Sequence, residues 1–322
     1  MRKLLPLCLT IPCLGFVWGF FAHKKINRLA VFTLPSEMIG FYKKNIEFLT
    51  EESVSPDRRR YAVKDEAPRH YIDLDDFGDS AIFKLPRTWQ KAVERYGEDS
   101  LMEKGIVPWH VTRMYYQLKT AMLLYDPQKI LWASAELGHY VADANVPLHT
   151  TSNYDGQLTN QVGLHGFWES RLPELFFNDY DFFVGKASYI GNVPDYAWQA
   201  VTNAHLALDS VLYLEKHVGE KLKNKKYSFE TRGKQTVKVV SYQYAKAYHS
   251  ALDGMVERQM RASVKMIGDL WYTAWVDAGQ PDLKKLIDYK PSTQELETRE
   301  KELELWKGRN YPARKHEEDG NN

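Results

Sequence analysis

The stretch PQKILWASAELGHYVADANVPLHT, residues 127–150, gives the strongest indication of the fold. Pro127 suits the first turn of a helix, and apolar residues recur at helical spacing as far as Ala144. Pro147 then ends the helix, because a proline disfavours helical backbone in the residue before it. The stretch therefore predicts a long, mostly apolar helix followed at once by a tight loop.

Helical periodicity extends along most of the chain, and the alternation typical of strands is nearly absent. Further helices are expected over residues 32–50, 78–104, 163–172, 194–223 and 239–277, and one more begins at residue 108. Polar loops are expected over residues 51–70 and 150–162. No repeat of fixed period is present. These features predict an all-α protein with a single multi-helix domain over residues 18–280.

Composition and charge exclude several classes of protein. The 43 basic and 42 acidic residues leave a net charge of +1, so no extended surface for nucleic acid or anionic membranes is expected. Aromatic residues make up 13% of the chain, which excludes disorder throughout. Residues 281–322 are rich in charges and poor in apolar residues, which predicts a solvated, partly disordered tail with a helix over about 293–306. Nothing in the sequence calls for an obligate protein partner.

The N-terminus has the pattern of an export signal. Two basic residues precede an apolar run, which predicts a signal peptide over residues 1–17 and a periplasmic or secreted protein. The alternative is a membrane anchor over residues 4–21, because the apolar character continues beyond the expected cleavage point. Cys8 and Cys13 both lie in this segment. A mature chain without it would bind metals through His, Asp and Glu alone.

Four histidines are followed four residues later by a carboxylate, a spacing that places both side chains on one face of a helix. The pairs are His139/Asp143, His165/Glu169, His205/Asp209 and His249/Asp253. The first two pairs and His149 fall within 31 residues, in apolar surroundings. Burying such groups is costly unless they are paired, and a metal ion would pair them. The other two pairs are interpreted as structural contacts.

With these residues the sequence resembles the zinc-dependent phospholipase C and single-strand nuclease superfamily. Those all-α enzymes hold three zinc ions in one cleft and cleave phosphodiesters. The resemblance is carried by 18-WGFFAH-23, 56-PDRRR-60, 69-RHYID-73 and the segment 139–169. The C-terminal half of the chain is similar only in being helical.

The resemblance implies up to three zinc ions. One would be held by Asp57, His70, His139 and Asp143, and a second by His149, His165 and Glu169. The third would be held by His23, by Asp143 as a bridge, and by the amino group and carbonyl of Trp18. This third site requires Trp18 to be the first residue of the mature chain, because an amide nitrogen within a longer chain is a poor ligand.

Further residues receive roles around the implied metal centre. Asp57 and Arg60 are the catalytic candidates, since the resemblance places a transition-state arginine at Arg60 and a guanidinium can grip two phosphate oxygens. The alternative for Arg60 is a place in the solvated run Arg58–Arg60. The alternative for Asp57 is that Asp65 or Glu66 in the same loop takes its place. Asp73 is a candidate for substrate binding, or else a helix or loop cap. Glu136 is expected to orient a metal ligand without binding the metal itself, or else to be solvated.

The function implied is an exported, zinc-dependent hydrolase of phosphodiesters, most like phospholipase C. The short spacing between His149 and His165, and Glu169 as the last acid, favour a phospholipid substrate. Arg60 and the phrase HYID at 70–73 favour a single-strand endonuclease instead. A hypothesis from another class is a non-catalytic, zinc-stabilised binding protein anchored in a membrane, which the apolar N-terminus and charged tail favour.

Overall fold

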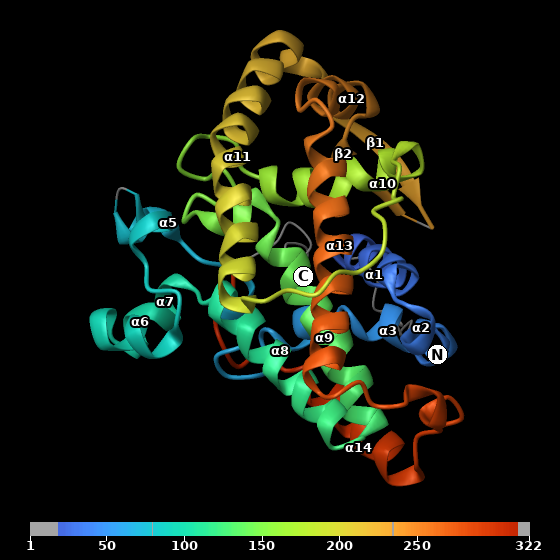
Figure 1. Cartoon of the computed structure of the whole chain (residues 1–322). Coiled ribbons are helices and arrows are strands. Elements are labelled where there is room, and N and C mark those ends of the chain that lie inside the picture. Colours follow the sequence, from blue (N-terminus) through green and yellow to red (C-terminus); the bar gives the residue numbers. More distant parts are fainter. Residues whose placement is uncertain (1–18, 79, 234, 315–322) are drawn as a thin grey trace, which may run out of the picture.

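The computed structural model describes residues 19–314 apart from 79 and 234, and this part of the chain is mainly helical (Figure 1). The predicted helical class is confirmed, with one two-stranded antiparallel sheet as an exception. None of the helices within the described residues is long and apolar enough to span a membrane. The expected signal peptide over 1–17, most of the alternative anchor over 4–21, and Trp18 lie outside the described residues.

Helix α9 (Pro127–Ala144) lies at the centre of the fold, with the bounds that its prolines predict. Its first turn is capped by Asp126, whose carboxylate accepts a hydrogen bond from the backbone N–H of Lys129 at 3.0 Å. The helices packed most extensively against it are α1 (Gly19–Ala30), α3 (Ile46–Glu52), α8 (Val107–Leu123), α11 (Val193–Leu222) and α13 (Met255–Asp277). Because neighbours surround it, α9 is buried on almost every side from Ile130 onward, including the polar residues Ser134, His139 and Asp143.

Helices α1 and α9 approach each other closely at Gly138. A Cβ atom at this position would lie 2.0 Å from Oδ1 of Asn27, so a larger residue would push the helices apart. One turn before Asn27, the His23 side chain reaches the level of His139, and the two rings stack with centroids 4.0 Å apart. The glycine therefore helps to bring α1 to the polar side of α9.

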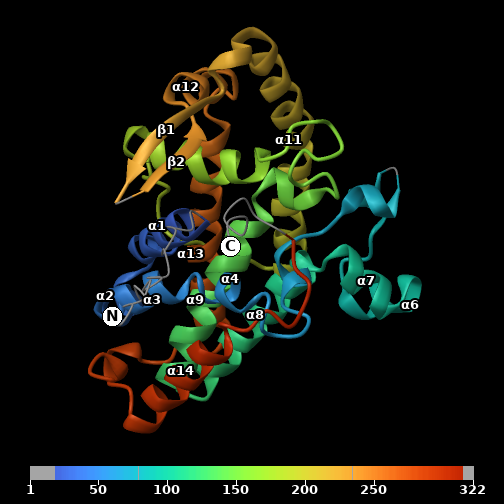
Figure 2. The same cartoon turned by 180° about the vertical axis from the view of Figure 1, so that it is seen from behind.

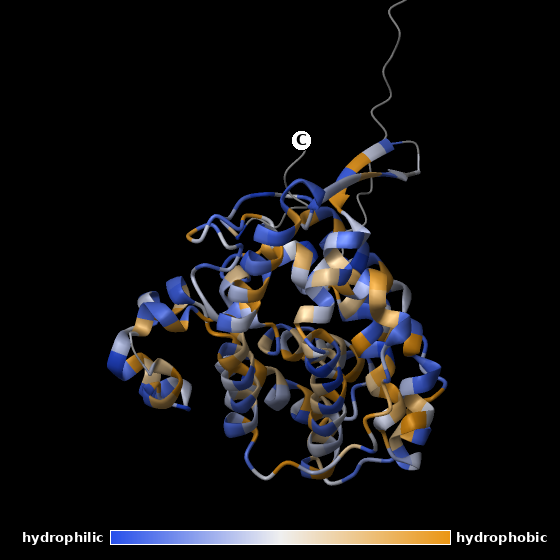
Figure 3. Ribbon diagram, turned by 90° about the horizontal axis from the view of Figure 1, so that it is seen from above, coloured by the Kyte–Doolittle hydropathy of each residue, from blue (hydrophilic) through white to orange (hydrophobic). Residues whose placement is uncertain are grey.

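The remaining large side chains fill the space between the helices. The largest fully buried ones include Trp198, Trp271, Tyr42, Tyr115 and Tyr140. Figure 3, which looks down on the molecule from above, shows helices that carry hydrophobic and hydrophilic residues on the same ribbon. This is expected of helices with one face against a common core.

The single helix expected over 239–277 is wrong. Residues 242–277 form two helices, α12 (Tyr242–Ala251) and α13, because Asp253 and Gly254 between them have φ values of 48° and 72°. Such left-handed backbone cannot continue a right-handed helix. The break allows α12 to turn aside while α13 continues along α9 (Figure 1).

Residues just before α12 form a β-hairpin that is not among the elements expected from the sequence. Strands β1 (Tyr227–Arg232) and β2 (Gln235–Val240) pair antiparallel, with Tyr227 opposite Val240. Apolar residues alternate along both strands, at Tyr227 and Phe229 and at Val237 and Val239, which is the period-two signal of a strand. The signal is short, and only residues 239 and 240 fall within an element expected from the sequence, the helix over 239–277.

Several predicted segments are divided in the structure. The region over 32–50 begins with a 3₁₀ turn and continues in α2 (Ser36–Lys44) and α3. The stretch over 78–104 forms α5 (Ala81–Lys84), α6 (Trp89–Tyr96) and α7 (Glu98–Lys104), which lie to one side of the domain (Figure 1). Gly97 separates α6 from α7 with φ at 76°. The expected loop over 51–70 contains α4 (Ser55–Arg59), which becomes important for the site.

The segment expected to be a solvated tail packs against the domain as far as residue 314. Its predicted helix is present as α14 (Thr293–Leu305), which begins with a capping box formed by Ser292 and Glu295. From α14, Arg299 forms an ion pair with Glu52 and lies 4.5 Å from the ring centroid of Trp132. Charged side chains can therefore attach a segment that has few apolar residues of its own.

Candidate metal centre

Side chains from separate segments converge on one buried cleft. They are His23 on α1, Asp57 on α4, His70 in a 3₁₀ turn (Ala67–His70), His139 and Asp143 on α9, His149 in a 3₁₀ turn (Pro147–Thr150), and His165 and Glu169 at a π-helical turn (Gly166–Arg171). The structure thus brings together every metal ligand expected from the sequence that lies within the described residues. Trp18 lies outside them.

The first group consists of His70, His139 and Asp143. Nδ1 of His70 lies 2.9 Å from Oδ2 of Asp143. Nε2 of His139 lies 3.0 Å from that His70 nitrogen and 3.2 Å from that Asp143 oxygen. Oδ1 of Asp57 is more distant, at 3.8 Å from His70 and 3.9 Å from His139. Two ligand atoms of a tetrahedral zinc site are about 3.3 Å apart. The four side chains can therefore face one ion after small adjustments.

The second group consists of His149, His165 and Glu169. The two Nε2 atoms are 2.9 Å apart, and Oε2 of Glu169 lies 3.4 Å from His149 and 3.1 Å from His165. His165 and Glu169 are presented by the π-helical turn that precedes α10 (Leu172–Phe176). Such turns are rare and often occur at functional sites. These three atoms form the second group that could hold a metal ion.

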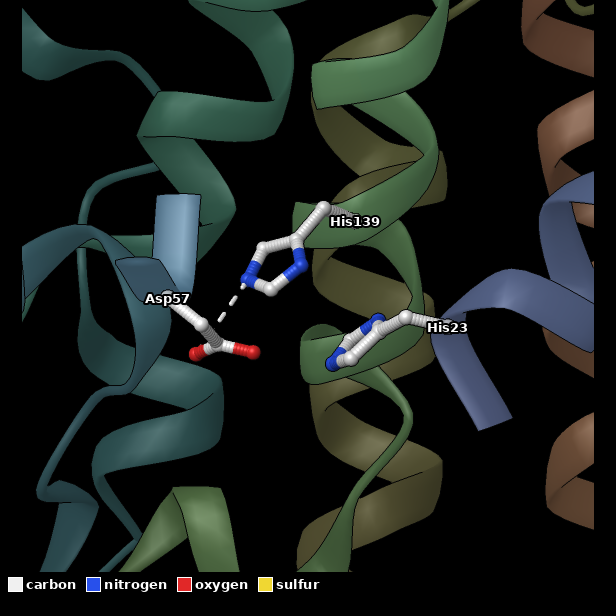
Figure 4. A group of neighbouring side chains, drawn as sticks. All are labelled: His23, Asp57 and His139. Atoms are coloured by element: carbon white, nitrogen blue, oxygen red, sulfur yellow. Dashed lines mark ion pairs between the residues drawn. The ribbon is translucent and has the colours of Figure 1, made fainter. Parts of the chain in front are cut away.

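The third group differs in composition from the expected one. His23, Asp57 and His139 point toward one another from three different elements, and an ion pair joins Asp57 to His139 (Figure 4). His23 also contacts Asp143, as expected, with Nε2 at 3.3 Å from Oδ1. Its other ring nitrogen is buried and has no hydrogen-bond partner within the described part of the chain.

Asp143 lies between the groups and contacts four histidines. Oδ1 faces His23 at 3.3 Å and His149 at 3.5 Å, while Oδ2 faces His70 and His139. Burial alone would raise the pKa of this carboxyl, but the facing histidines hold the pKa well below its usual range. Asp143 therefore remains ionised, with one oxygen facing His23 and His149 and the other facing His70 and His139, as a bridging ligand requires.

The backbone sets the orientation of His139. Its Nδ1 lies 2.7 Å from the carbonyl oxygen of Ser53, and a carbonyl can only accept a hydrogen bond. Nδ1 therefore carries the proton, and Nε2 presents a lone pair to the cleft. Metal-bound histidines are commonly fixed in this way by a hydrogen bond from the other ring nitrogen.

Glu66 is a buried residue that the sequence offers only as an alternative to Asp57. It accepts hydrogen bonds from Arg59 at 2.9 Å, from Arg69 at 2.7 Å and from the hydroxyl of Tyr140. One oxygen lies 3.6 Å from Nε2 of His70, on the side of the ring away from Asp143. Glu66 thus supports His70 electrostatically. A search for an acid four residues before a histidine, as well as after it, would have found this pair.

Glu136 lies behind the cleft and does not contact a candidate ligand directly. It forms an ion pair with Arg59, which in turn pairs with Glu66. The expected support from Glu136 therefore reaches His70 only through two intervening side chains.

The histidines of the cleft have strongly perturbed protonation. Burial lowers the pKa of His70, but its hydrogen bond with Asp143 and the nearby carboxylate of Glu66 raise the pKa to about 9. The pKa of His23 and that of His165 are also raised, by Asp143 and Glu169 respectively, against the effect of burial. The pKa of His139 is lowered by burial and by the neighbouring His23. A bound cation would replace protons that the carboxylates otherwise attract.

Arg60 and Asp73 occupy different positions relative to the cleft. Arg60 lines it, and its Nη1 lies 3.3 Å from Oδ1 of Asp57. Asp73 lies outside the lining and forms an ion pair with Arg314, which does line the cleft. Burial raises the pKa of Asp73 to about 6. The residue expected to bind substrate is thus engaged with the C-terminal segment.

Two cavities differ greatly in size and chemistry. The cleft with the metal-ligand candidates measures about 30 Å³, roughly the share of one water molecule in liquid water. A cavity of about 1560 Å³ is lined mainly by α8, α9 and α14, with Trp109, Trp132 and Trp306 among its walls. None of the clustered histidines lines this larger cavity. The donor set, rather than the volume, identifies the small cleft as the candidate functional site.

The chain matches no protein-family model and no curated protein sequence. The side chains of the cleft and their geometry therefore carry the functional conclusion.

Proposed function

We propose that the protein is a zinc-dependent hydrolase of phosphodiester bonds with a fold of the phospholipase C and nuclease type. The observation that carries the proposal is the gathering of five histidines and three carboxylates in one cleft, with Asp143 between the groups. A donor set of imidazole and carboxylate in a mostly buried site suits zinc. Zinc supplies a water of lowered pKa near neutral pH and stabilises negative charge on phosphate oxygens.

The protein's own residues would hold the ions and orient the substrate. His70, His139, Asp143 and Asp57 would bind one ion, and His149, His165 and Glu169 another. Asp57 is kept ionised because His139 and Arg60 lower its pKa against the effect of burial. It also holds the Arg60 guanidinium at the cleft, where this group would grip phosphate oxygens.

A phospholipid is the proposed substrate, on the basis of the short interval from His149 to His165 and of Glu169 as the last acid. Single-stranded nucleic acid is the alternative, which Arg60 and the HYID phrase favour.

We further propose export to the periplasm or medium with Trp18 as the first residue of the mature protein. N-terminal sequencing of exported protein tests this, and a mature chain that retains residues 1–17 would contradict it.

The activity is tested by supplying zinc-loaded protein with phosphatidylcholine, single-stranded DNA and a chromogenic phosphodiester. Chelator-treated protein is the reference for each substrate. We expect turnover that depends on zinc and is lost in His149→Ala. His205→Ala is the matched control, because it also removes a histidine but one outside the donor set. His205 contacts the residue after His149, with Nδ1 3.1 Å from the Thr150 hydroxyl. Turnover of none of the three substrates would refute the proposal and would favour a zinc-stabilised binding protein.

A further inference from the structure

The last described residues, which follow α14, reach the cleft. After α14, the backbone N–H groups of Asn310 and Tyr311 donate to the carbonyl of Tyr61 at 2.8 and 2.9 Å. The hydroxyl of Tyr61 donates to the carbonyl of Arg314 at 3.2 Å. Figure 2 shows this segment, in red, passing close to α4. Residues 310–314, here called the C-terminal strap, are thus attached beside Asp57 and Arg60.

The strap places one guanidinium in the wall of the cleft. Arg314 lies over the ring of Tyr71, with Cζ 3.3 Å from its centroid, and 4.6 Å from that of Tyr154. Its Nη2 pairs with Asp73. Its Nη1 is buried and has no hydrogen-bond partner among residues 19–314 as described. Two aromatic rings and one carboxylate therefore fix the group while one pair of its N–H donors stays unused.

An unused donor of this kind calls for an anionic ligand. A buried cationic donor without a hydrogen-bond partner destabilises the protein. The partners that a guanidinium binds most strongly are carboxylate and phosphate groups. Arg314 and Arg60 line the same cleft as the metal-ligand candidates. A phosphate oxygen entering this small cleft would therefore lie near both guanidinium groups.

We propose that Arg314 is a phosphate-binding residue of the active site and that Asp73 is the residue that positions it. This inference rests on the proposed function, because it assigns a second arginine to the phosphate of the same substrate. It also gives Asp73 a different role from direct substrate binding. The phosphate could belong to a phospholipid, a nucleotide or inorganic phosphate, since the guanidinium recognises the group that they share.

The test uses the zinc-loaded full chain and inorganic phosphate as the probe, with binding measured by calorimetry. A chromogenic phosphodiester gives KM and kcat, and elemental analysis gives the zinc content. We expect Arg314→Ala to weaken phosphate binding and raise KM by about 10- to 100-fold, the range typical of a hydrogen bond to a charged group. Arg314→Lys should lose less, because charge remains but the planar fork does not. Zinc content should be unchanged in both.

Lys307→Ala is the matched control, because it removes a charge from an exposed position between α14 and the C-terminal strap. It should leave phosphate binding at the wild-type level. Asp73→Asn should weaken phosphate binding in the wild-type background and have little further effect in Arg314→Ala. Such non-additivity separates a positioning role from an independent structural one.

Two results would overturn the inference. The first is phosphate binding by Arg314→Ala that equals that of the wild type. The second is an increase in turnover by Arg314→Ala or by a chain ending at residue 307, which would make the strap a closure of the cleft. Failure of the proposed function is distinguishable, since it appears as absent turnover in the wild type while phosphate binding still responds to Arg314.

Discussion

Replacing Glu66 by glutamine would test whether the cleft depends on charges behind its ligands. Glu66 is fully buried and accepts from Arg59 and Arg69, while one oxygen faces His70 at 3.6 Å. Removing one partner of a buried ion pair costs about 3–5 kcal/mol. Arg59 would keep its pair with Glu136, and the Arg69 side chain is 24% exposed. We therefore expect a smaller loss of unfolding free energy, about 2–3 kcal/mol.

The same substitution should weaken zinc binding at the group that contains His70. Loss of a carboxylate that supports a metal-bound histidine typically costs about 10- to 100-fold in metal affinity. Urea unfolding of metal-free protein measures the first effect, and competition with a chromogenic chelator measures the second.

Glu136→Gln is the matched control, because it removes a carboxylate from the same Arg59 without contacting His70. It should lower stability and leave zinc affinity near that of the wild type. The reasoning would be refuted if Glu66→Gln bound zinc as tightly as Glu136→Gln does.

Three further outcomes follow from the packing and protonation of the site. Gly138→Ala should destabilise the protein by about 1–3 kcal/mol in urea unfolding, because its Cβ would meet Asn27, whereas Gly191→Ala, with open space around it, should be nearly neutral. Burial holds the pKa of His110 well below 6.5, so the unfolded chain binds the extra proton and stability falls as pH drops below 6.5. His110→Leu should remove about 1.4 kcal/mol per pH unit of that slope between pH 6.5 and 5, and an unchanged slope would contradict this assignment. Zinc binding at pH 7.5 should release protons, since Asp143 and Glu66 raise the pKa of His70 to about 9 against the effect of burial. Calorimetry in buffers of different ionisation enthalpy measures this release, and a value of zero would disprove it.

Helical periodicity and proline positions were sufficient to predict α8, α9 and α11. Pro127 and the loop after Ala144 give the bounds of α9 directly, because proline restricts the backbone locally. The division of residues 239–277 was not predictable in the same way, since it depends on two residues with positive φ. Short range signals therefore define where a helix starts more reliably than where it breaks.

The identity of the candidate ligands also came from sequence, through histidine–carboxylate spacing on helices and the resemblance around it. Spacing places two side chains on one face, but it says nothing about which faces meet. Only the tertiary structure shows that Asp143 faces four histidines, because those histidines lie on four different segments of the chain.

The surroundings of the ligands were decided by tertiary structure alone. Ser53 orients His139 through a backbone carbonyl, and any residue type could supply that atom. Arg314 reaches Asp73 across 241 residues of sequence, because the strap folds back over the cleft. Local sequence carries the chemistry of each side chain, whereas long-range packing determines which groups share a cleft and which protons they hold.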